Sequence, residues 1–336
     1  MAAEQSLIEA AQAGDEAAFT RLVEPHRREL RAHCYRFSGS LHDAEDLLQE
    51  SLLRAWRGLD GFAGRSSLRT WLFRIATRVC LDALEARSRR MLPMDLGPAS
   101  TAADAVPAPN TEPIWIEPWP DGDGAGVSPE APLMRRESVA LAFVVALQLL
   151  PAKQRAVLLL HDVLGWQASD CADLLDSSVA SVNSALQRAR QTIDARGPAF
   201  AEVSPALPDA RTGALLSRYV AAWENTDVAA LVALLREDAI LAMPPFPSWH
   251  RGPAEIGASL AGMVLVPGSA GRFRLRPTRA SGQPALATYR RDDETGSYQA
   301  SSIQLLYLAG DRISAIVAFL DPSLFPLFGL PPVLAP

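Results

Sequence analysis

The feature that most constrains this chain is an acidic, proline-rich segment that interrupts it. Residues 92–132 hold nine prolines, four glycines and seven acidic side chains, with no Lys or Arg. Each proline lacks an amide donor and restricts the residue before it, so the segment cannot form a long helix or a central strand. We therefore expect a flexible acidic linker over residues 92–132 that separates independently folded parts.

Four large apolar residues stand out within this linker, namely Ile114, Trp115, Ile116 and Trp119. A fully solvated linker has no use for them, so we expect them to dock on a folded surface. Two interpretations stay open. The simpler is a local patch that covers an adjacent domain; the other is an acidic, aromatic segment that occupies a nucleic-acid groove by mimicking phosphate and base.

Length and charge distribution limit the remaining classes. A chain of 336 residues has room for two or three domains. Its net charge of −6 arises in the linker, because residues 1–91 and 133–196 each carry +1 and residues 197–336 carry −1. The acidic total therefore does not exclude a nucleic-acid partner for a local basic face.

The sequence does not indicate a membrane protein, a secreted protein or a metal-binding protein. The longest apolar runs are shorter than the roughly 18 residues of a membrane span, and the first residues lack the form of a signal peptide. The three cysteines, Cys34, Cys80 and Cys171, are widely spaced and form no metal-binding pair. We expect buried, reduced thiols in a cytoplasmic protein, with no metal and no cofactor.

The sequence pattern of residues 1–91 predicts a helical module. Apolar residues recur at helical spacing from Asp43, a plausible N-cap, to Leu59, and the polar side of that helix includes Asp46, Gln49 and Glu50. A glycine-containing break follows, and a second helix is predicted over 68–90. Six arginines and two aromatic residues on this helix suit melted nucleic acid, because cations neutralise phosphates and rings stack on bases. A solvated Arg-rich face over a packed helix is the alternative.

Residues 133–196 read as a second helical module that ends in a helix-turn-helix. The pattern predicts helices over 151–161, 167–175 and 179–195, the last with Ser178 as N-cap. In that last helix Val182, Leu186 and Ala189 face inward. The exposed side suits the major groove of DNA, although an ordinary helical hairpin has the same rhythm. Its polar residues are Ser181, Asn183, Ser184, Gln187, Arg188 and Arg190.

These segments also carry a family resemblance. Residues 43–50, 54–56 and 68–77 resemble domain 2 of extracytoplasmic-function RNA polymerase sigma factors, and residues 150–155 and 181–190 resemble their domain 4. The resemblance implies that Asp46, Gln49 and Glu50 bind the clamp helices of the polymerase largest subunit. It implies that the helix from Val179 reads the minus-thirty-five duplex. The melted minus-ten strand would be bound by the loop and helix that carry Arg65, Ser66, Arg69, Trp71, Arg74 and Arg78. Asn is common in the family where Arg78 stands, which bears on the preferred minus-ten base.

The last part of the chain has a different pattern. A short linker is expected over 197–211, then two helices and five short strands over 212–336, which is typical of an α+β domain. This order resembles the cone-shaped SnoaL-like or nuclear-transport-factor-2-like domain, which encloses a pocket and includes isomerases. Candidate lining residues are Trp223, Met243, Phe246, Trp249, His250, Arg274, Tyr289, Gln304, Phe319 and Asp321. Among them His250 is either a general base or, as we favour, a packing residue.

We therefore expect a multidomain fold of two all-α modules and a C-terminal α+β cone. The expected function is that of a sigma factor without covalent chemistry, which takes core RNA polymerase and promoter DNA as partners. Since neither module is strongly basic, polymerase should supply the remaining contacts to DNA. The C-terminal domain is expected to modulate activity in cis through the modules or the linker. The alternatives are an isomerase-like enzyme or a small-molecule sensor in the C-terminal pocket.

Overall fold

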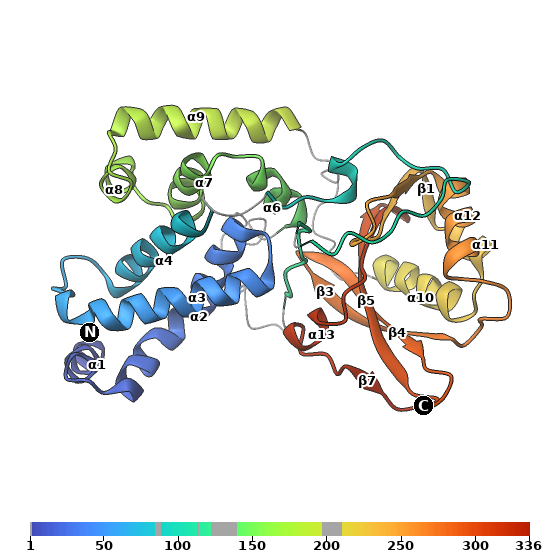
Figure 1. The fold of residues 1–336 in the computed structure, drawn as a ribbon, viewed down its shortest axis with the longest axis horizontal. Coiled ribbons are helices and arrows are strands. Elements are labelled where there is room, and N and C mark those ends of the chain that lie inside the picture. The colour runs from blue at the N-terminus through green and yellow to red at the C-terminus, as the bar shows by residue number, and fades with distance from the viewer. Residues whose placement is uncertain (1, 85–88, 113, 122–139, 197–209) are drawn as a thin grey trace. The chain divides into compact units, whose positions relative to one another are not determined.

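The computed structural model describes residues 2–84, 89–112, 114–121, 140–196 and 210–336 (Figure 1). It divides into two compact units. One unit comprises Met1–Arg90 with Phe143–Arg196, and the other comprises Met91–Ala142 with Gly197–Pro336. Residues 122–132 of the predicted linker, 133–139 of the second module and 197–209 of the second linker lie outside the described residues, as do 85–88 of the predicted helix 68–90.

The first module is helical, as predicted. Its elements are α1 (Ala2–Gln12), α2 (Glu16–Ser38), α3 (Leu41–Gly58), the short 3-10 turn η1 (Leu59–Gly61) and α4 (Leu68–Leu84). Helix α3 begins two residues before the predicted start, because the hydroxyl of Ser40 accepts a hydrogen bond from the Asp43 amide at 3.2 Å. The N-cap is therefore Ser40 and the prediction of Asp43 was wrong.

A buried histidine lies at the centre of this module. His33 of α2 is fully buried between the rings of Phe37 and Phe73, with centroid distances of 5.0 and 5.1 Å. Its Nε2 lies 2.9 Å from the Thr77 hydroxyl, which itself donates to the Phe73 carbonyl. The Thr77 oxygen therefore accepts from Nε2–H. Burial lowers the pKa of His33 to about 3, so the ring is neutral.

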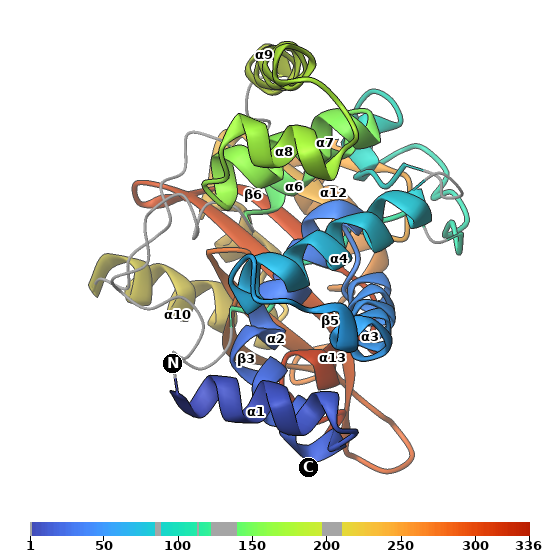
Figure 2. The same ribbon diagram turned by 90° about the vertical axis from the view of Figure 1, so that its left-hand side faces the viewer.

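The second module contains the predicted helix-turn-helix (Figure 2). Helices α6 (Leu141–Gln148) and α7 (Ala152–Leu158) precede a π-helical turn over Leu159–Val163, then α8 (Ala168–Leu174) and α9 (Val179–Arg196). Asp176 in the turn before α9 adopts the left-handed backbone conformation, with φ of 48°. The Ser178 hydroxyl accepts from the Ser181 amide at 3.2 Å, which confirms the predicted cap of α9.

The two modules contact each other at the C-terminal end of α2. The buried guanidinium of Arg155 in α7 donates to the carbonyl of Phe37 and to the side-chain oxygen of Gln148, the latter at 2.9 Å. Gln148 in turn donates to the carbonyl of Arg36 at 3.4 Å. The last carbonyls of a helix have no partner within it, so these two side chains satisfy groups that would otherwise be buried unpaired.

The C-terminal domain is an α+β fold, as predicted. Its sheet follows the order β2-β1-β6-β5-β4-β3, with β7 on β5, and only β1 and β6 pair in parallel. Helices α10 (Ala210–Glu224), α11 (Val228–Val232) and α12 (Pro253–Met263) share a hydrophobic core with it. A short α13 (Leu324–Leu327) lies near the C-terminus. The strands are β1 (Leu235–Ala242), β2 (Trp249–Arg251), β3 (Phe273–Ala280), β4 (Gln283–Arg291), β5 (Tyr298–Ala309), β6 (Arg312–Phe319) and β7 (Val333–Leu334).

Candidate polymerase and nucleic-acid interfaces

The α3 residues predicted to meet polymerase form an open face. Asp46 and Gln49 are exposed, whereas Ala44, Leu47 and Leu48 on the other side of the helix are buried. Leu53, one turn further along the same face, is 41% exposed, which is high for a leucine. Asp46, Gln49 and Leu53 are thus accessible to a partner on one side of α3.

Neighbouring charges hold Glu50 on this face. Arg54 donates from Nε to Glu50 at 2.7 Å and from a terminal nitrogen to Asp82 of α4 at 2.8 Å. These hydrogen bonds, that to Asp82 foremost, raise the pKa of Arg54. The pairs are solvent-exposed, so they orient the side chains more than they stabilise the fold.

The arginines of the loop and helix predicted to bind the minus-ten strand differ in their exposure to solvent. Arg65 and Arg78 are exposed. Arg69 donates to Glu29 of α2 at 2.8 Å, and its guanidinium lies 4.8 Å from the centre of the Phe73 ring. Trp71 is half-buried against Phe62, with ring centres 5.1 Å apart. Ser66 lies in the loop, partly buried.

Arg74 faces the second module instead of solvent. Its guanidinium lies 5.9 Å from the ring of Trp166, a largely buried residue before α8. Such a contact between a cation and an aromatic face is favourable when water is partly excluded. Within the described structure, a predicted nucleic-acid contact is therefore occupied by a residue of the other module.

Helix α9 presents its predicted reading face to solvent. Val182, Leu186 and Ala189 are buried, as the periodicity predicts. A short helix α8 packs behind α9, which is the arrangement that places a second helix in a major groove. All six predicted contact residues are exposed, namely Ser181, Asn183, Ser184, Gln187, Arg188 and Arg190.

One of these six residues forms an ion pair with another side chain. Arg190 donates to both carboxylate oxygens of Asp162, at 2.6 and 3.0 Å, and His161 contacts the same carboxylate at 2.8 Å. Despite partial burial, hydrogen bonds from Arg190 and His161 lower the pKa of Asp162. The pair fixes Arg190 at one flank of the reading face.

The described part of the acidic linker packs on the C-terminal domain. We call residues 91–112 and 114–121 the strap. Ile116 is fully buried, and Trp115 and Trp119 are 8% and 5% exposed. The strap bonds to the domain at several points, including Asn110 N–H to the Pro245 carbonyl at 2.8 Å. This agrees with the first of the two interpretations of the linker, a patch that covers an adjacent domain.

The end of the strap pairs with the hairpin turn between β3 and β4. Ser281 and Gly282 both have positive φ, as a two-residue hairpin turn requires. The Ser281 amide donates to the Trp119 carbonyl at 2.7 Å, and the Gly282 amide donates to the Asp121 carboxylate at 3.1 Å. Pro120 forms an antiparallel bridge with Ala280. The turn thus binds the strap with two amides, one on a backbone carbonyl and one on a carboxylate.

His250 is held under the strap. Its Nδ1 donates to the Ser100 carbonyl at 3.1 Å, so its Nε2 accepts from the Ser259 hydroxyl at 3.0 Å. Trp249 beside it donates from its indole to the Gly97 carbonyl at 2.9 Å. Both predicted pocket residues therefore fasten the strap to the domain.

The other predicted pocket residues lie in separate places. Trp223 and Met243 belong to the hydrophobic core, where Trp223 contacts Phe273 at a ring distance of 5.6 Å. Gln304 is buried between Tyr219 and Thr288, with hydrogen bonds of 2.6 and 2.9 Å. The remainder comprises Arg274 stacked on Tyr298, Tyr289 bonded to the Pro331 carbonyl, buried Phe319, partly buried Phe246, and Asp321 bonded to the Ser323 amide.

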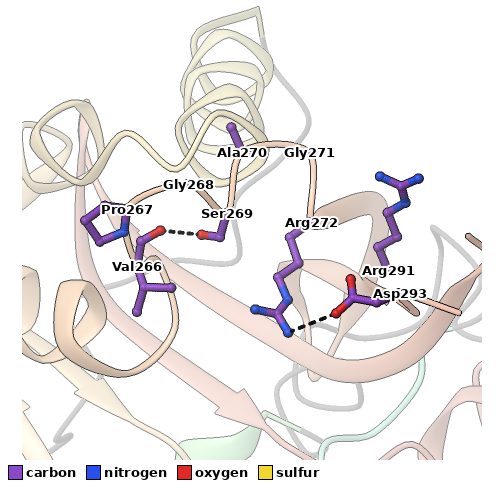
Figure 3. A pocket seen from close by; sticks show the side chains of 9 residues that line it. All are labelled: Val266, Pro267, Gly268, Ser269, Ala270, Gly271, Arg272, Arg291 and Asp293. Atoms are coloured by element: carbon purple, nitrogen blue, oxygen red, sulfur yellow. Dashed lines mark hydrogen bonds and ion pairs between the residues drawn. The ribbon is translucent and has the colours of Figure 1, made fainter.

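A small polar cavity lies elsewhere in this domain (Figure 3). It has a volume of about 240 Å³ and lies beside the loop from Val266 to Arg272, with Arg291 and Asp293 at its other side. Figure 3 shows the guanidinium of Arg272 directed at Asp293, at 3.9 Å, and that of Arg291 directed away. None of the ten predicted pocket residues lines this cavity.

Sequence reasoning missed Asp162, Trp166 and the strap's partners on the turn at Ser281. An isolated tryptophan gives no periodic signal, and Asp162 lies in a π-helical turn that no pattern predicts. In the described part of the chain, no helix is long and apolar enough to cross a membrane.

Comparisons with known proteins agree with this geometry. Family models match residues 22–90 as Sigma-70 region 2, residues 140–193 as Sigma-70 region 4 and residues 216–316 as a SnoaL-like domain. The chain is 48% identical over 315 residues to the ECF RNA polymerase sigma factor SigG of Mycobacterium tuberculosis (strain ATCC 25618 / H37Rv). That alignment covers 93% of this chain and 84% of the relative.

Of two further matches, one covers only part of this chain and the other covers nearly all of it. The chain is 31% identical over 191 residues to the ECF RNA polymerase sigma-E factor of Escherichia coli (strain K12), which covers 57% of this chain and 92% of that protein. The crystal structure of the Mycobacterium tuberculosis extracytoplasmic function sigma factor SigJ has the same fold, with a TM-score of 0.58 at 23% identity, covering 91% of this chain and 97% of that one. The chain therefore belongs to the extracytoplasmic-function RNA polymerase sigma factors, with a SnoaL-like domain after its two sigma modules.

Proposed function

We propose that this sigma factor docks on the polymerase clamp through the α3 face at Asp46, Gln49 and Glu50, and that it reads promoter DNA with two separate surfaces. The loop before α4 and the exposed side of α4 bind the melted minus-ten strand. Helix α9 binds the minus-thirty-five duplex. The observation that carries the proposal is α9 itself, whose six polar contact residues are all exposed while its apolar residues are buried.

The contact between modules makes DNA binding dependent on polymerase. Promoter elements near positions −10 and −35 are about 25 base pairs apart, or about 85 Å at about 3.4 Å per pair. Helix α9 of 18 residues is about 27 Å long. With Arg155 of one module inserted at the end of α2 of the other, the two modules form one compact unit, and we expect its two DNA-binding surfaces to lie closer together than that. Polymerase must therefore separate the modules.

The C-terminal domain acts in cis by holding the strap. The strap belongs to the connection between the two modules, and its contacts with β2, α12 and the β3–β4 turn shorten the length of chain that is free to extend. We expect this domain to set the reach between the modules without covalent chemistry, in the cytoplasm where polymerase acts.

Run-off transcription with core polymerase tests the cis role. A double variant, Trp119→Ala with Asp121→Ala, removes the buried ring of Trp119 from the strap and the carboxylate that accepts from the Gly282 amide. It should change the dependence of transcription on the spacer between the two promoter elements by about 3-fold or more at non-optimal lengths. Asp104→Ala is the matched control, because Asp104 is exposed and bonds to Thr101 within the strap. An unchanged spacer profile in the double variant would refute regulation through the strap.

The sigma-factor assignment of surfaces has its own test. Replacing Asp46 and Gln49 with Ala should weaken binding to core polymerase and leave binding of the isolated minus-thirty-five duplex unchanged. Arg188→Ala should do the opposite. If both sets of variants lower both activities equally, the two surfaces do not have separate roles.

A small-molecule ligand in the C-terminal domain is a second candidate function. The observation that favours it is the cavity beside Val266–Arg272, whose lining has two arginines and one aspartate and so suits a small anion. Titration of the full chain with inorganic phosphate and with acetate, followed by calorimetry, tests it. Arg272→Ala should abolish any heat that arises at this site, whereas equal heats in both proteins would place the binding elsewhere.

A further inference from the structure

Helix α1 lies outside the residues that match the sigma region 2 model, which begin at residue 22. Yet α1 packs on the turn that precedes the minus-ten loop. Ala11 joins Ala18 and Leu59 in a small hydrophobic cluster, and the partly buried side chains around it include Phe62 and Trp71. The cluster connects the N-terminal helix to the start of the loop and to an aromatic residue of α4.

A single side chain bonds across this turn. Gln12 is the last residue of α1. Its side-chain nitrogen Nε2 donates to the carbonyl of Leu59 at 3.0 Å and lies 3.4 Å from the carbonyl of Phe62. These two carbonyls stand at the beginning of the turn η1 and directly after its end. The Leu59 carbonyl also accepts from the Phe62 amide at 2.9 Å. Gln12 therefore ties both sides of η1 to α1.

The other end of the loop has its own anchor. The Ser67 hydroxyl accepts from the Thr70 amide at 3.1 Å and so begins α4. Between these anchors lie Arg65 and Ser66, which have the exposed or partly exposed side chains that the proposed function assigns to the minus-ten strand. The position of the first anchor decides where these side chains stand relative to Trp71, which packs on Phe62.

We propose that Gln12 is a positioning residue for recognition of the melted minus-ten strand, acting through η1 on the loop that carries Arg65 and Ser66. The inference rests on the proposed minus-ten role of that loop. Gln12 need not touch DNA. It fixes the direction in which the loop leaves α3, so that the loop and Trp71 form one preorganised surface for an unstacked base.

The test compares full-length variants in holoenzyme with core polymerase. The probe is a fork-junction DNA whose minus-ten sequence is selected from a random pool by the wild-type holoenzyme. Gln12→Leu removes the donor at similar size, and Gln12→Glu places an acceptor against the two carbonyls. Gln5→Leu is the matched control, because Gln5 is an exposed glutamine on α1 that bonds to Glu9 in its own helix. The readout is discrimination, which is the affinity for the selected probe divided by the affinity for each single-base change.

Both Gln12 variants should lose discrimination by about 2- to 10-fold, the effect expected for one or two hydrogen bonds. Their affinities for core polymerase and for the minus-thirty-five duplex should stay at the wild-type value, as should all properties of Gln5→Leu. Gln12→Asn, which keeps the amide on a shorter stem, should keep more discrimination than Gln12→Leu.

Other results would overturn the proposal in distinguishable ways. If Arg65→Ala lowers discrimination and the Gln12 variants do not, the loop reads DNA but Gln12 does not position it. If Arg65→Ala with Ser66→Ala leaves discrimination unchanged, the assigned role of the loop fails and the inference fails with it. If the Gln12 variants lose core affinity and melting temperature together with discrimination, Gln12 has only a general structural role.

Discussion

Helices α9 and α4 are both assigned to DNA, but they differ in how their polar side chains are used. On α9 the contact residues all face solvent, and only Arg190 is held by a partner side chain, Asp162, within the described residues. On α4 Arg69 binds Glu29 and Arg74 lies against Trp166 of the other module. The proposed duplex-reading surface is thus exposed in this structure, whereas the proposed minus-ten surface has one of its arginines against Trp166.

This difference has a consequence for the order of events. A surface that needs no rearrangement binds with the affinity its contacts provide, whereas a covered surface binds with an affinity reduced by the fraction of molecules in which it is open. Polymerase binding, which we expect to separate the modules, should therefore strengthen minus-ten binding more than minus-thirty-five binding.

The largest expected effect is on α9. Replacing Arg188 with Ala should lower affinity for the minus-thirty-five duplex by about 5- to 150-fold, because a side chain that reaches a base edge contributes about 1–3 kcal/mol. The measurement is fluorescence anisotropy of the holoenzyme with a labelled duplex. Arg218→Ala is the control, since Arg218 is an exposed arginine on α10. Equal losses in both variants would mean that only net charge is being measured.

The second effect concerns the support beneath α4. Because burial holds the pKa of His33 at about 3, the unfolded chain binds a proton between about pH 6.5 and 3 that the folded chain does not. The free energy of unfolding should therefore fall as the pH drops below about 6.5, by up to about 1.4 kcal/mol per unit from this residue. The protection factors of the α4 amides, which are corrected for the intrinsic pH dependence of hydrogen exchange, should be smaller at pH 5 than at pH 7.5.

The matching variant is His33→Leu, which has similar volume and no titration. It should remove that part of the pH dependence of stability, while Thr77 keeps its bond to the Phe73 carbonyl at 2.7 Å. Urea unfolding at several pH values measures it. If the variant keeps the full acid sensitivity of the wild type, the buried neutral histidine is not its cause.

A smaller effect is expected at the open end of α4. Arg78 is exposed, so its replacement by Ala should reduce the affinity of holoenzyme for the melted minus-ten strand by about 3- to 10-fold. The salt dependence of binding should lose about one unit of slope, as expected for one phosphate contact. Arg218→Ala again serves as control. A reduced affinity with an unchanged slope would assign Arg78 to a base instead of a phosphate.

The helical modules could be predicted closely because their signals are local. The spacing of Val182, Leu186 and Ala189 defines one buried side of α9, and every polar residue expected opposite them is exposed. A single cap, Asp43, was misplaced, because Ser40, three residues earlier, can also cap the helix and only the chain direction into α3 decides between them.

The C-terminal site could not be predicted in the same way. The strands were found approximately, but β2 and α12 were missed, since β2 has three residues and the short α12 contains glycines at Gly257 and Gly262. Which side chains line a cavity depends on how a sheet closes and on what covers it. Here the strap occupies the positions near Trp249 and His250, a contact between residues about 150 positions apart in the sequence. Periodicity carries no information about such pairing.

The smallest expected effect is at the flank of α9. Arg190 shares both oxygens of Asp162, so its charge is partly neutralised and its direction is fixed before DNA binds. Arg190→Ala should therefore cost less affinity for the minus-thirty-five duplex than Arg188→Ala, about 2- to 3-fold. It should change stability by less than about 1 kcal/mol, because half of the Arg190 side chain is exposed. Asp162→Asn provides the counterpart, since it frees Arg190 and should raise non-specific affinity for DNA at low salt. If Arg190→Ala instead equals Arg188→Ala in effect, the arginine leaves Asp162 when DNA binds, and α9 resembles α4 in needing a rearrangement.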